Sequence, residues 1–275
     1  MPRTNTRESR QQQAFWRDPA LPFVESRRAC HSRACYRAHS HPTFSIGAVD
    51  AGRSVFSGAG EQPIALHPGM LVFVPASRVH ACNPAPDASW SYQMLHLDAA
   101  WLQATRAEYA TTLADEPIRI LDEPGLYRQF CRLNDVLFST ADSAEKETAL
   151  IEFIGDQDLT HLAGIHLPLP DNVSHERLQP ALRRLAKTPG ADVPLGELAS
   201  LAGMSRYQLI RAFRRSTGLT PHAWQLNQRI NLAREHMRAG ADIATVAQDL
   251  GFADQAHLQR VFKAHTGVTP GRYRA

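Results

Sequence analysis

The sequence predicts an α+β protein of two domains. The first is an antiparallel β-barrel with a helical subdomain, and the second is an all-α domain with two helix-turn-helix units joined by a long helix. Three observations support this fold class. Short apolar runs separated by Gly and Pro fill residues 23–97, and apolar residues at three- and four-residue spacing follow from residue 99. A segment that begins at Leu198 recurs from Val246.

The charge is divided unevenly along the chain. Of the 275 residues, 1–174 carry a net charge of −5 and 175–275 a net charge of +8, within an overall charge of +3. Hydrophobic residues make up 43% and charged residues 21%, which excludes a chain that is disordered throughout. An acidic body joined to a basic domain predicts that only the second domain meets a polyanion.

Targeting signals and cysteine frameworks are not recognisable in this sequence. The cysteines, Cys30, Cys35, Cys82 and Cys131, are too few and too scattered for a disulfide scaffold. Residues 1–20 begin with a polar stretch that lacks the apolar core of a secretory signal, and we expect a flexible tail there. No apolar run approaches the roughly 20 residues that span a bilayer. A cytoplasmic protein with no membrane partner is therefore expected.

The predicted barrel covers residues 21–98. We expect strands at 44–49, 53–56, 64–66, 70–74, 79–82 and 90–97. Short, closely spaced strands with turn residues between them are typical of antiparallel barrels and sandwiches. The helical subdomain covers residues 99–165, with helices expected at 101–109, 124–140 and 143–163. The apolar stripes of these helices either pack on the barrel or form a dimer interface, and the sequence leaves both open.

A linker is predicted between the domains. Residues 166–174 contain two prolines and an Asp-Asn pair, a composition typical of a connecting segment. The second domain then covers residues 175–275. Its first helix is expected at 176–186, ended by Thr188-Pro189-Gly190.

The second domain contains an internal repeat. Leu198–Pro221 recurs as Val246–Pro270, with Gly203 matching Gly251. Each copy predicts a helix, a tight turn at the glycine and a capped second helix, within about 195–216 and 243–265. The long helix between the copies, Pro221–Arg238, fixes the distance between the two units. Two such units can enter one face of B-DNA only if they lie roughly 34 Å apart.

The second helix of each unit presents basic and amide side chains outward. Arg can bind guanine through two hydrogen bonds, Gln can bind adenine, and other cations suit phosphate. Arg211 and Arg260 share one repeat position and are the first choices for base contacts, whereas Arg214, Arg215 and Lys263 are expected on phosphate. The predicted DNA-binding residues are Arg206, Tyr207, Ile210, Arg211, Arg214, Arg215, Gln255, Ala256, His257, Gln259, Arg260 and Lys263.

Residues 174–275 resemble the AraC-type DNA-binding domain. The resemblance rests on the two helix-turn-helix units, the linking helix and the ending GFADQAHLQRVFKAHTGVTPGRYR. It implies a bacterial transcription factor, most often an activator that contacts RNA polymerase and reads bases through both second helices. By position, the base contacts that it implies fall on Tyr207, Ile210, Arg211, Gln255, Ala256, Gln259 and Arg260. Ile210 and Ala256 can offer apolar contact only.

The first domain resembles a cupin barrel. His39-Ser40-His41 is similar to the His-x-His strand of cupins, and Pro68-Gly69 followed by His80 is similar to their second motif. AraC-type regulators often carry such a barrel as their effector domain. Metal-binding cupins usually place a glutamate four residues after the second histidine, where this chain has Ser45. The usual carboxylate ligand is therefore missing.

Three interpretations of the barrel remain open at the level of sequence. A small organic effector would use His39, His41, His80 and Tyr92 as hydrogen-bonding groups. A metal such as zinc would instead use His39, His41, His80 and Cys82, since imidazole and thiolate suit a borderline ion. The third interpretation is that these side chains fill the barrel or its rim and bind nothing.

The sequence as a whole predicts a sequence-specific transcription regulator, not an enzyme, that binds promoter DNA and responds to an effector or metal in its barrel. A homodimer is expected, formed through the helices between Pro124 and Ala163. The first alternative is a metal-dependent cupin enzyme fused to a DNA-binding domain, which normally requires the missing carboxylate. The second is an architectural DNA-binding protein, for which so long an acidic half is not needed.

Overall fold

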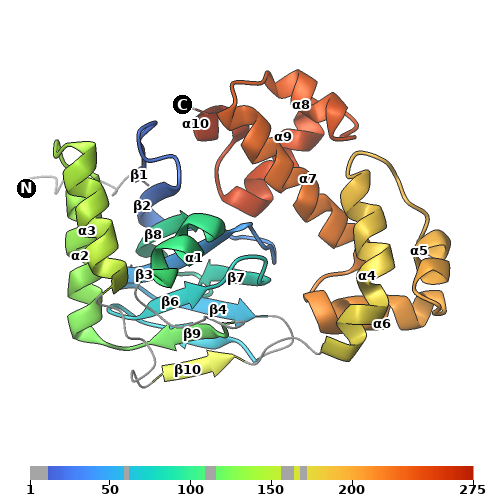
Figure 1. Ribbon diagram of the computed structural model, residues 1–275, viewed down its shortest axis with the longest axis horizontal. Helices are drawn as coiled ribbons and strands as arrows, with labels where there is room; N and C mark the ends of the chain where they lie inside the picture. Colours follow the sequence, from blue (N-terminus) through green and yellow to red (C-terminus); the bar gives the residue numbers. More distant parts are fainter. Residues whose placement is uncertain (1–11, 59–61, 109–115, 156–163, 168–171, 275) are drawn as a thin grey trace, which may run out of the picture.

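Two antiparallel sheets form the N-terminal domain (Figure 1). The computed structural model describes residues 12–58, 62–108, 116–155, 164–167 and 172–274. The larger sheet has the strand order β1-β2-β8-β3-β6-β9-β10, and the smaller has the order β5-β4-β7. The strands are β1 (Gln12–Arg17), β2 (Val24–Ser32), β3 (Thr43–Gly52), β4 (Ser54–Gly58), β5 (Ile64–Leu66), β6 (Leu71–Val74), β7 (His80–Pro84), β8 (Trp90–Asp98), β9 (Ile118–Leu121) and β10 (Gly164–Leu167).

The sheets pack face to face over an apolar core. Phe56 and Leu66 of the smaller sheet meet Val72, Tyr92 and Ile120 of the larger one. Alternation along each strand sends these side chains to one face, as the predicted strand pattern requires. Burial of a side chain of this size contributes about 1.5–3 kcal/mol. The predicted antiparallel N-terminal architecture is confirmed.

Three helices cover the other face of the larger sheet: α1 (Ala99–Ala107), α2 (Pro124–Leu137) and α3 (Ser143–Gly155). Phe130 of α2 and Leu150 of α3 are fully buried with Leu95 and Leu97 of β8. The apolar stripes therefore pack on the sheet, which resolves the choice that the sequence left open. Ile151 of α3 points outward and is 38% exposed.

The structure differs from the predicted domain boundaries in three places. Residues 12–17, predicted as part of the tail, form β1 on β2, because Phe15 and Trp16 point to opposite sides and both find apolar partners. Strands β9 and β10 belong to the larger sheet, although β9 and the first half of β10 lie in the predicted helical subdomain. The predicted linker overlaps the end of β10 and the start of α4 (Asn172–Lys187). Residues 1–11, 156–163 and 168–171 lie outside the described residues.

The C-terminal domain is helical, and both helix-turn-helix units are confirmed. Its helices are α4 (Asn172–Lys187), α5 (Leu195–Leu201), α6 (Arg206–Thr217), α7 (Pro221–Arg238), α8 (Ile243–Asp249), α9 (Gln255–Thr266) and α10 (Pro270–Arg274). Ser205 accepts a hydrogen bond from the Gln208 backbone N–H at 3.2 Å and thereby caps α6. Asp254 accepts one from the His257 backbone N–H at 2.6 Å and caps α9. None of the described helices has the length and apolarity needed to cross a membrane.

Helix α7 joins the two units through one buried arginine. The Arg229 side chain donates to the backbone oxygen of Pro189 at 2.6 Å, next to the first unit, and to that of Gly251 at 2.9 Å, in the turn of the second. A guanidinium has five donors in a rigid fork, so one side chain can hold both loops. Figure 1 shows α8–α10 beside the sheets and α4–α6 at the far end of α7.

The two repeat-related glycines give a matched test of this packing. Gly203 and Gly251 have φ of 60° and 70°, but an added Cβ meets nothing within 4 Å at Gly203 and lies 2.0 Å from the Gly190 oxygen at Gly251. We expect Gly203→Ala to lower the free energy of unfolding by about 1–2 kcal/mol through backbone strain alone. Gly251→Ala should cost clearly more, because a backbone oxygen must also move. Equal losses in urea-induced unfolding would contradict the close approach.

Candidate effector cavity and DNA-recognition helices

The domains dock through polar contacts on Ser40. Asn227 of α7 accepts from the Ser40 backbone N–H at 3.2 Å and donates to the Ser40 carbonyl at 3.0 Å. Asn231, one turn later, donates to the same carbonyl at 3.1 Å. Nearby, the Arg37 N–H donates to the backbone oxygen of Ala264 in α9 at 2.9 Å. The segment that precedes β3 is therefore fastened directly to the DNA-binding domain.

A buried carboxylate provides the second docking contact. Glu25 of β2 pairs with Arg17 at 2.9 Å, with Arg234 of α7 at 3.5 Å and also with Arg238. Burial acts to raise the pKa of Glu25, but the guanidinium groups of Arg234 and Arg238 outweigh it and hold this pKa far below its ordinary value. Glu25 thus stays ionised at neutral pH and neutralises part of the positive charge of α7.

A cavity of about 80 Å³ lies between the two domains. Its volume exceeds the roughly 10–15 Å³ that one water molecule occupies. The apolar part of its wall consists of Phe15, Trp90, Met94, Ile230, Val268 and the ring of Tyr273. Its polar lining comes from Glu25, Arg27, Tyr36, His39, Ser40, His41, His80, Cys82, Tyr92, His96, Asn227, Asn231, Arg234, His265 and Thr266. Both domains therefore contribute to the wall.

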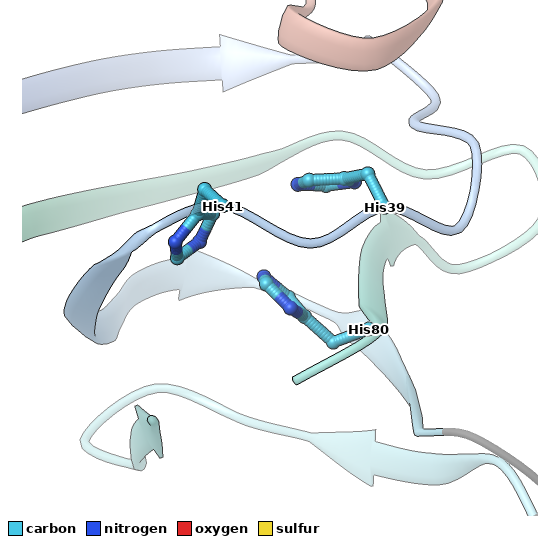
Figure 2. Close-up of side chains that lie close together, drawn as sticks. All are labelled: His39, His41 and His80. Atoms are coloured by element: carbon cyan, nitrogen blue, oxygen red, sulfur yellow. The ribbon is translucent and has the colours of Figure 1, made fainter. Parts of the chain in front are cut away.

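Three of the predicted residues converge at this cavity. Figure 2 shows the rings of His39, His41 and His80 turned toward one another. Ligand atoms of the three lie within 4.8 Å of one another, and the ring centroids of His39 and His80 are 4.8 Å apart. His39 and His41 come from the segment before β3, and His80 begins β7 and bridges to His39.

Backbone carbonyls orient all three imidazoles. The Nδ1 atoms of His39, His41 and His80 lie 2.7, 2.8 and 3.0 Å from the carbonyl oxygens of Arg37, Thr43 and Arg78. A carbonyl oxygen only accepts, so each Nδ1 carries the hydrogen and each Nε2 is an acceptor with a lone pair. Burial is the largest cause that lowers the pKa of each ring, which keeps the rings neutral at neutral pH.

The other predicted barrel residues are placed as follows. Tyr92 lines the cavity, and its hydroxyl lies 2.7 Å from that of Tyr36. Cys82 also lines it but is absent from the group of converging ligand atoms in the described residues. Burial raises the pKa of the Cys82 thiol to about 12, so the metal-binding thiolate is disfavoured there. Ser45, at the position of the usual glutamate, places its Oγ 3.4 Å from His41 Nε2.

Sequence reasoning missed a fourth histidine. His96 of β8 is not among the residues predicted from the sequence, yet its ring centroid lies 4.9 Å from that of His41, at the same cavity. Burial lowers the pKa of His96 to about 3, against the opposing effect of Glu25. A signal was present in the chain: Tyr92, Met94 and His96 alternate along β8 and therefore face one side of the sheet.

The charged and amide groups of the cavity were missed as well. Glu25 and Arg27 are two residues apart on β2, and this spacing places two charges on one face of a strand. Asn227, Asn231 and Arg234 recur at four- and three-residue spacing on α7, which forms a polar stripe on one helix face. Both patterns can be found in the sequence, but neither identifies the surface against which these side chains pack.

Most predicted DNA-binding residues are exposed on α6 and α9. The exposed set is Arg206, Tyr207, Arg211, Arg214, Arg215, Gln255, Ala256, Gln259, Arg260 and Lys263. Tyr207 is 68% exposed, and Arg211 donates to its hydroxyl at 3.3 Å. The C-terminal end of α9 faces the cavity through His265 and Thr266, whereas its first turns face solvent.

Two of the predicted contacts are only half-buried and are engaged within the domain. Ile210 lines a groove together with Leu195 and Pro221. His257 accepts a hydrogen bond from the Ala253 backbone N–H at 3.3 Å, and its ring packs edge-on against Phe252. Their side chains are therefore less available to a base than those of Arg211 and Arg260.

Comparisons with known proteins assign the class. A model of the AraC-like ligand-binding domain matches residues 22–154, and a model of a helix-turn-helix domain matches residues 198–275. The chain is an AraC-family transcription regulator, with an N-terminal ligand-binding domain and a C-terminal DNA-binding domain. This finding confirms the family and the function predicted from the sequence.

Individual relatives agree with this class. The chain is 26% identical over 232 residues to the arabinose operon regulatory protein of Salmonella typhimurium, covering 82% of this chain and 80% of the relative. It is 22% identical over 230 residues to the regulator YbfI of Bacillus subtilis, covering 80% of each. Its fold is similar to ToxT of Vibrio cholerae solved with an unsaturated fatty acid: TM-score 0.56, 14% identity, 100% of this chain and 97% of ToxT.

The carboxylate at the domain interface gives a test of docking. Glu25→Gln should lower the free energy of unfolding by about 3–5 kcal/mol, because it leaves buried guanidinium groups without their counter-charge. The control is Asp135→Asn, which removes a pair with Arg28 whose acid is 72% exposed and should cost less than about 1 kcal/mol. Denaturant unfolding of both variants measures the difference.

The same variant has a defined pH dependence. A carboxyl group whose pKa is lowered in the folded state contributes stability above its ordinary pKa of 4.5 and loses it as the pH falls below that value. The difference between wild type and Glu25→Gln should therefore be constant from pH 6 to 8 and shrink toward pH 3. A difference that grows in acid would contradict the assigned ion pairs.

Proposed function

We propose that this regulator couples occupancy of the interdomain cavity to promoter recognition by α6 and α9. The observation that carries the proposal is that both domains form the cavity wall. The N-terminal domain contributes His41 and Tyr92, and the helical domain contributes Asn231 and Arg234. A ligand that touches both domains binds their docked arrangement more tightly than the separated one. Linkage then makes the ligand shift the population toward docking.

Promoter recognition is proposed to use the exposed residues of both second helices. Arg211 and Arg260 are proposed to bind base edges, and Arg214, Arg215 and Lys263 to bind phosphates. The exposure of all five side chains supports these roles. The capped, buried backs of α6 and α9 hold the helices rigidly, because Phe213 and Phe262 are fully buried.

We propose a homodimer and a contact with RNA polymerase as the assembly of this regulator. A homodimer would use the outer surface of α2 and α3, where Ile151 is exposed. A light-scattering mass of one chain at working concentration would contradict it. As an activator, the protein would contact RNA polymerase from a promoter in the cytoplasm, and transcription in vitro with purified polymerase tests this directly.

A metal-responsive regulator is the second candidate function. It is favoured by the three imidazoles, whose Nδ1 atoms bind carbonyls and each of which has a ring nitrogen within 4.8 Å of one from the other two. Histidines that bind metals are usually oriented in this way by a second hydrogen bond. Zinc would find three nitrogen ligands here, with its fourth position open to water or effector. The relatives are transcription regulators, and we propose no catalytic role for this site.

The metal alternative predicts a stoichiometric ion. Protein purified without chelator should hold about one zinc or similar ion per chain, and His41→Ala/His80→Ala should lose it. The matched control is His67→Ala, which alters an exposed histidine outside the group. Elemental analysis of the three proteins decides the matter, since a metal-free wild type that still binds its promoter excludes this candidate.

Promoter binding gives the direct test of the DNA-recognition residues. Arg211→Ala and Arg260→Ala should each weaken specific binding by about 1–3 kcal/mol and relax preference at one base position. Arg53→Ala, which alters an exposed arginine in the turn between β3 and β4, is the matched control and should bind normally. The measurement is competition binding on a promoter fragment selected from genomic DNA. An equal loss on every DNA sequence would instead assign these arginines to phosphate contacts.

A further inference from the structure

We propose that the ligand of the interdomain cavity is a small organic carboxylate whose charged group pairs with Arg27. This inference rests on the proposed effector function and specifies the chemistry of the effector. It follows from the charges that line the cavity, from the unfilled hydrogen-bonding capacity of one guanidinium, and from the apolar character of the remaining wall.

Positive charge is in excess around the cavity. Glu25 is the one acidic side chain among the described residues that line it, and Arg27 and Arg234 line it too. The Glu25 carboxylate is already shared among Arg17, Arg234 and Arg238. A second anion is therefore needed before the buried charges balance.

Arg27 is the guanidinium without an acidic partner. No carboxylate of the described residues pairs with it, and its hydrogen bonds go to neutral groups: the Thr266 carbonyl at 2.9 Å and the Tyr36 hydroxyl at 3.0 Å. Its Nε is buried and has no hydrogen-bond partner. A buried donor left unsatisfied is unfavourable, and more so when it carries charge.

Aromatic rings surround this guanidinium. Its central carbon lies 5.2 Å from the centroid of Phe15 and 5.6 Å from that of Tyr92. The rings limit the access of water and lower the local dielectric, which strengthens the attraction for an anion. The planar fork of arginine matches the two oxygens of a carboxylate.

The rest of the wall argues for an organic anion of small size. The remaining wall presents apolar surface from Trp90, Met94, Ile230 and Val268. An inorganic anion gains no favourable contact from such a surface, whereas the hydrocarbon part of an organic acid does. A volume of about 80 Å³ is smaller than the roughly 150 Å³ of an engineered cavity that holds benzene. A compact acid therefore fits with small adjustments of the wall. A neutral sugar would leave Arg27 without a counter-charge.

The position of Arg27 connects such a ligand to docking. Arg27 belongs to β2 of the ligand-binding domain and donates to Thr266, the last residue of the recognition helix α9. An acid held at Arg27 fixes the guanidinium that spans the two domains. Its binding is thus expected to strengthen docking at the end of a helix that faces DNA.

The test is calorimetric titration of the full chain with acids and their neutral amides. Butyrate and propionate are the acid probes, butyramide and propionamide are the isosteric controls, and inorganic phosphate is the third probe. We expect at least one acid to bind at least tenfold more tightly than its amide and than phosphate. Arg27→Gln should weaken that binding at least tenfold, whereas Arg28→Gln, which alters the neighbouring arginine paired with Asp135, should not.

Several outcomes would overturn the proposal. Equal binding of an acid and its amide, no binding of either acid, or phosphate binding as tight as the acids would each reject an organic carboxylate. The acid–amide comparison uses the unaltered protein, so it holds even if Arg27→Gln disturbs docking. Promoter binding measured in the same solutions distinguishes a failure of the proposed effector function from a failure of the carboxylate proposal. An acid that binds without changing promoter affinity contradicts the effector function alone, whereas a neutral compound that changes it contradicts the carboxylate alone.

Discussion

Helix α7 has to satisfy three partners at once, and this constraint organises the molecule. Arg229 on its buried side holds the loops of both helix-turn-helix units. Asn227 and Asn231 hold Ser40, and Arg234 shares the Glu25 carboxylate. These residues lie within two and a half helical turns, so a rotation or shift of α7 that improves one contact disturbs the others.

The contact on Ser40 brings the sensing and DNA-binding elements together. Ser40 stands between His39 and His41, the two histidines that line the cavity from this segment. A ligand that moves these rings also moves the peptide group that α7 holds. No further element is needed to couple the cavity to α7, because the same segment, His39–His41, lines the cavity and contacts α7. The contacts of Arg229 with Pro189 and Gly251 would then carry a displacement of α7 to both helix-turn-helix units, as the proposed function requires.

The parts predicted well from the sequence are those encoded by short-range signals. Gly203, Gly251, Ser205 and Asp254 define the turns and caps of the repeat, and the structure forms all of them. His39, His41, His80 and Tyr92 were found because they follow a strand period or a motif. The charged residues that line the cavity were not predicted, because Glu25 and Arg234 are more than two hundred residues apart and meet only when the two domains dock. β1 was missed for the same reason, since its apolar side chains meet partners from elsewhere.

The chemistry of the docking surface suits a reversible contact. Each domain has its own apolar cores, and Phe15 is the one apolar residue of the described sheets that packs against the core of the second unit. Beside it, the Arg17 guanidinium lies 4.4 Å from the centroid of the Tyr273 ring. Most of the other contacts that fasten the domains are hydrogen bonds and ion pairs, whose gain is largely offset by the loss of hydration. Separation of the domains therefore exposes little apolar core and returns the charges to water. A small difference in free energy between docked and separated states is what a single ligand can reverse, because it can shift an equilibrium only by its difference in affinity.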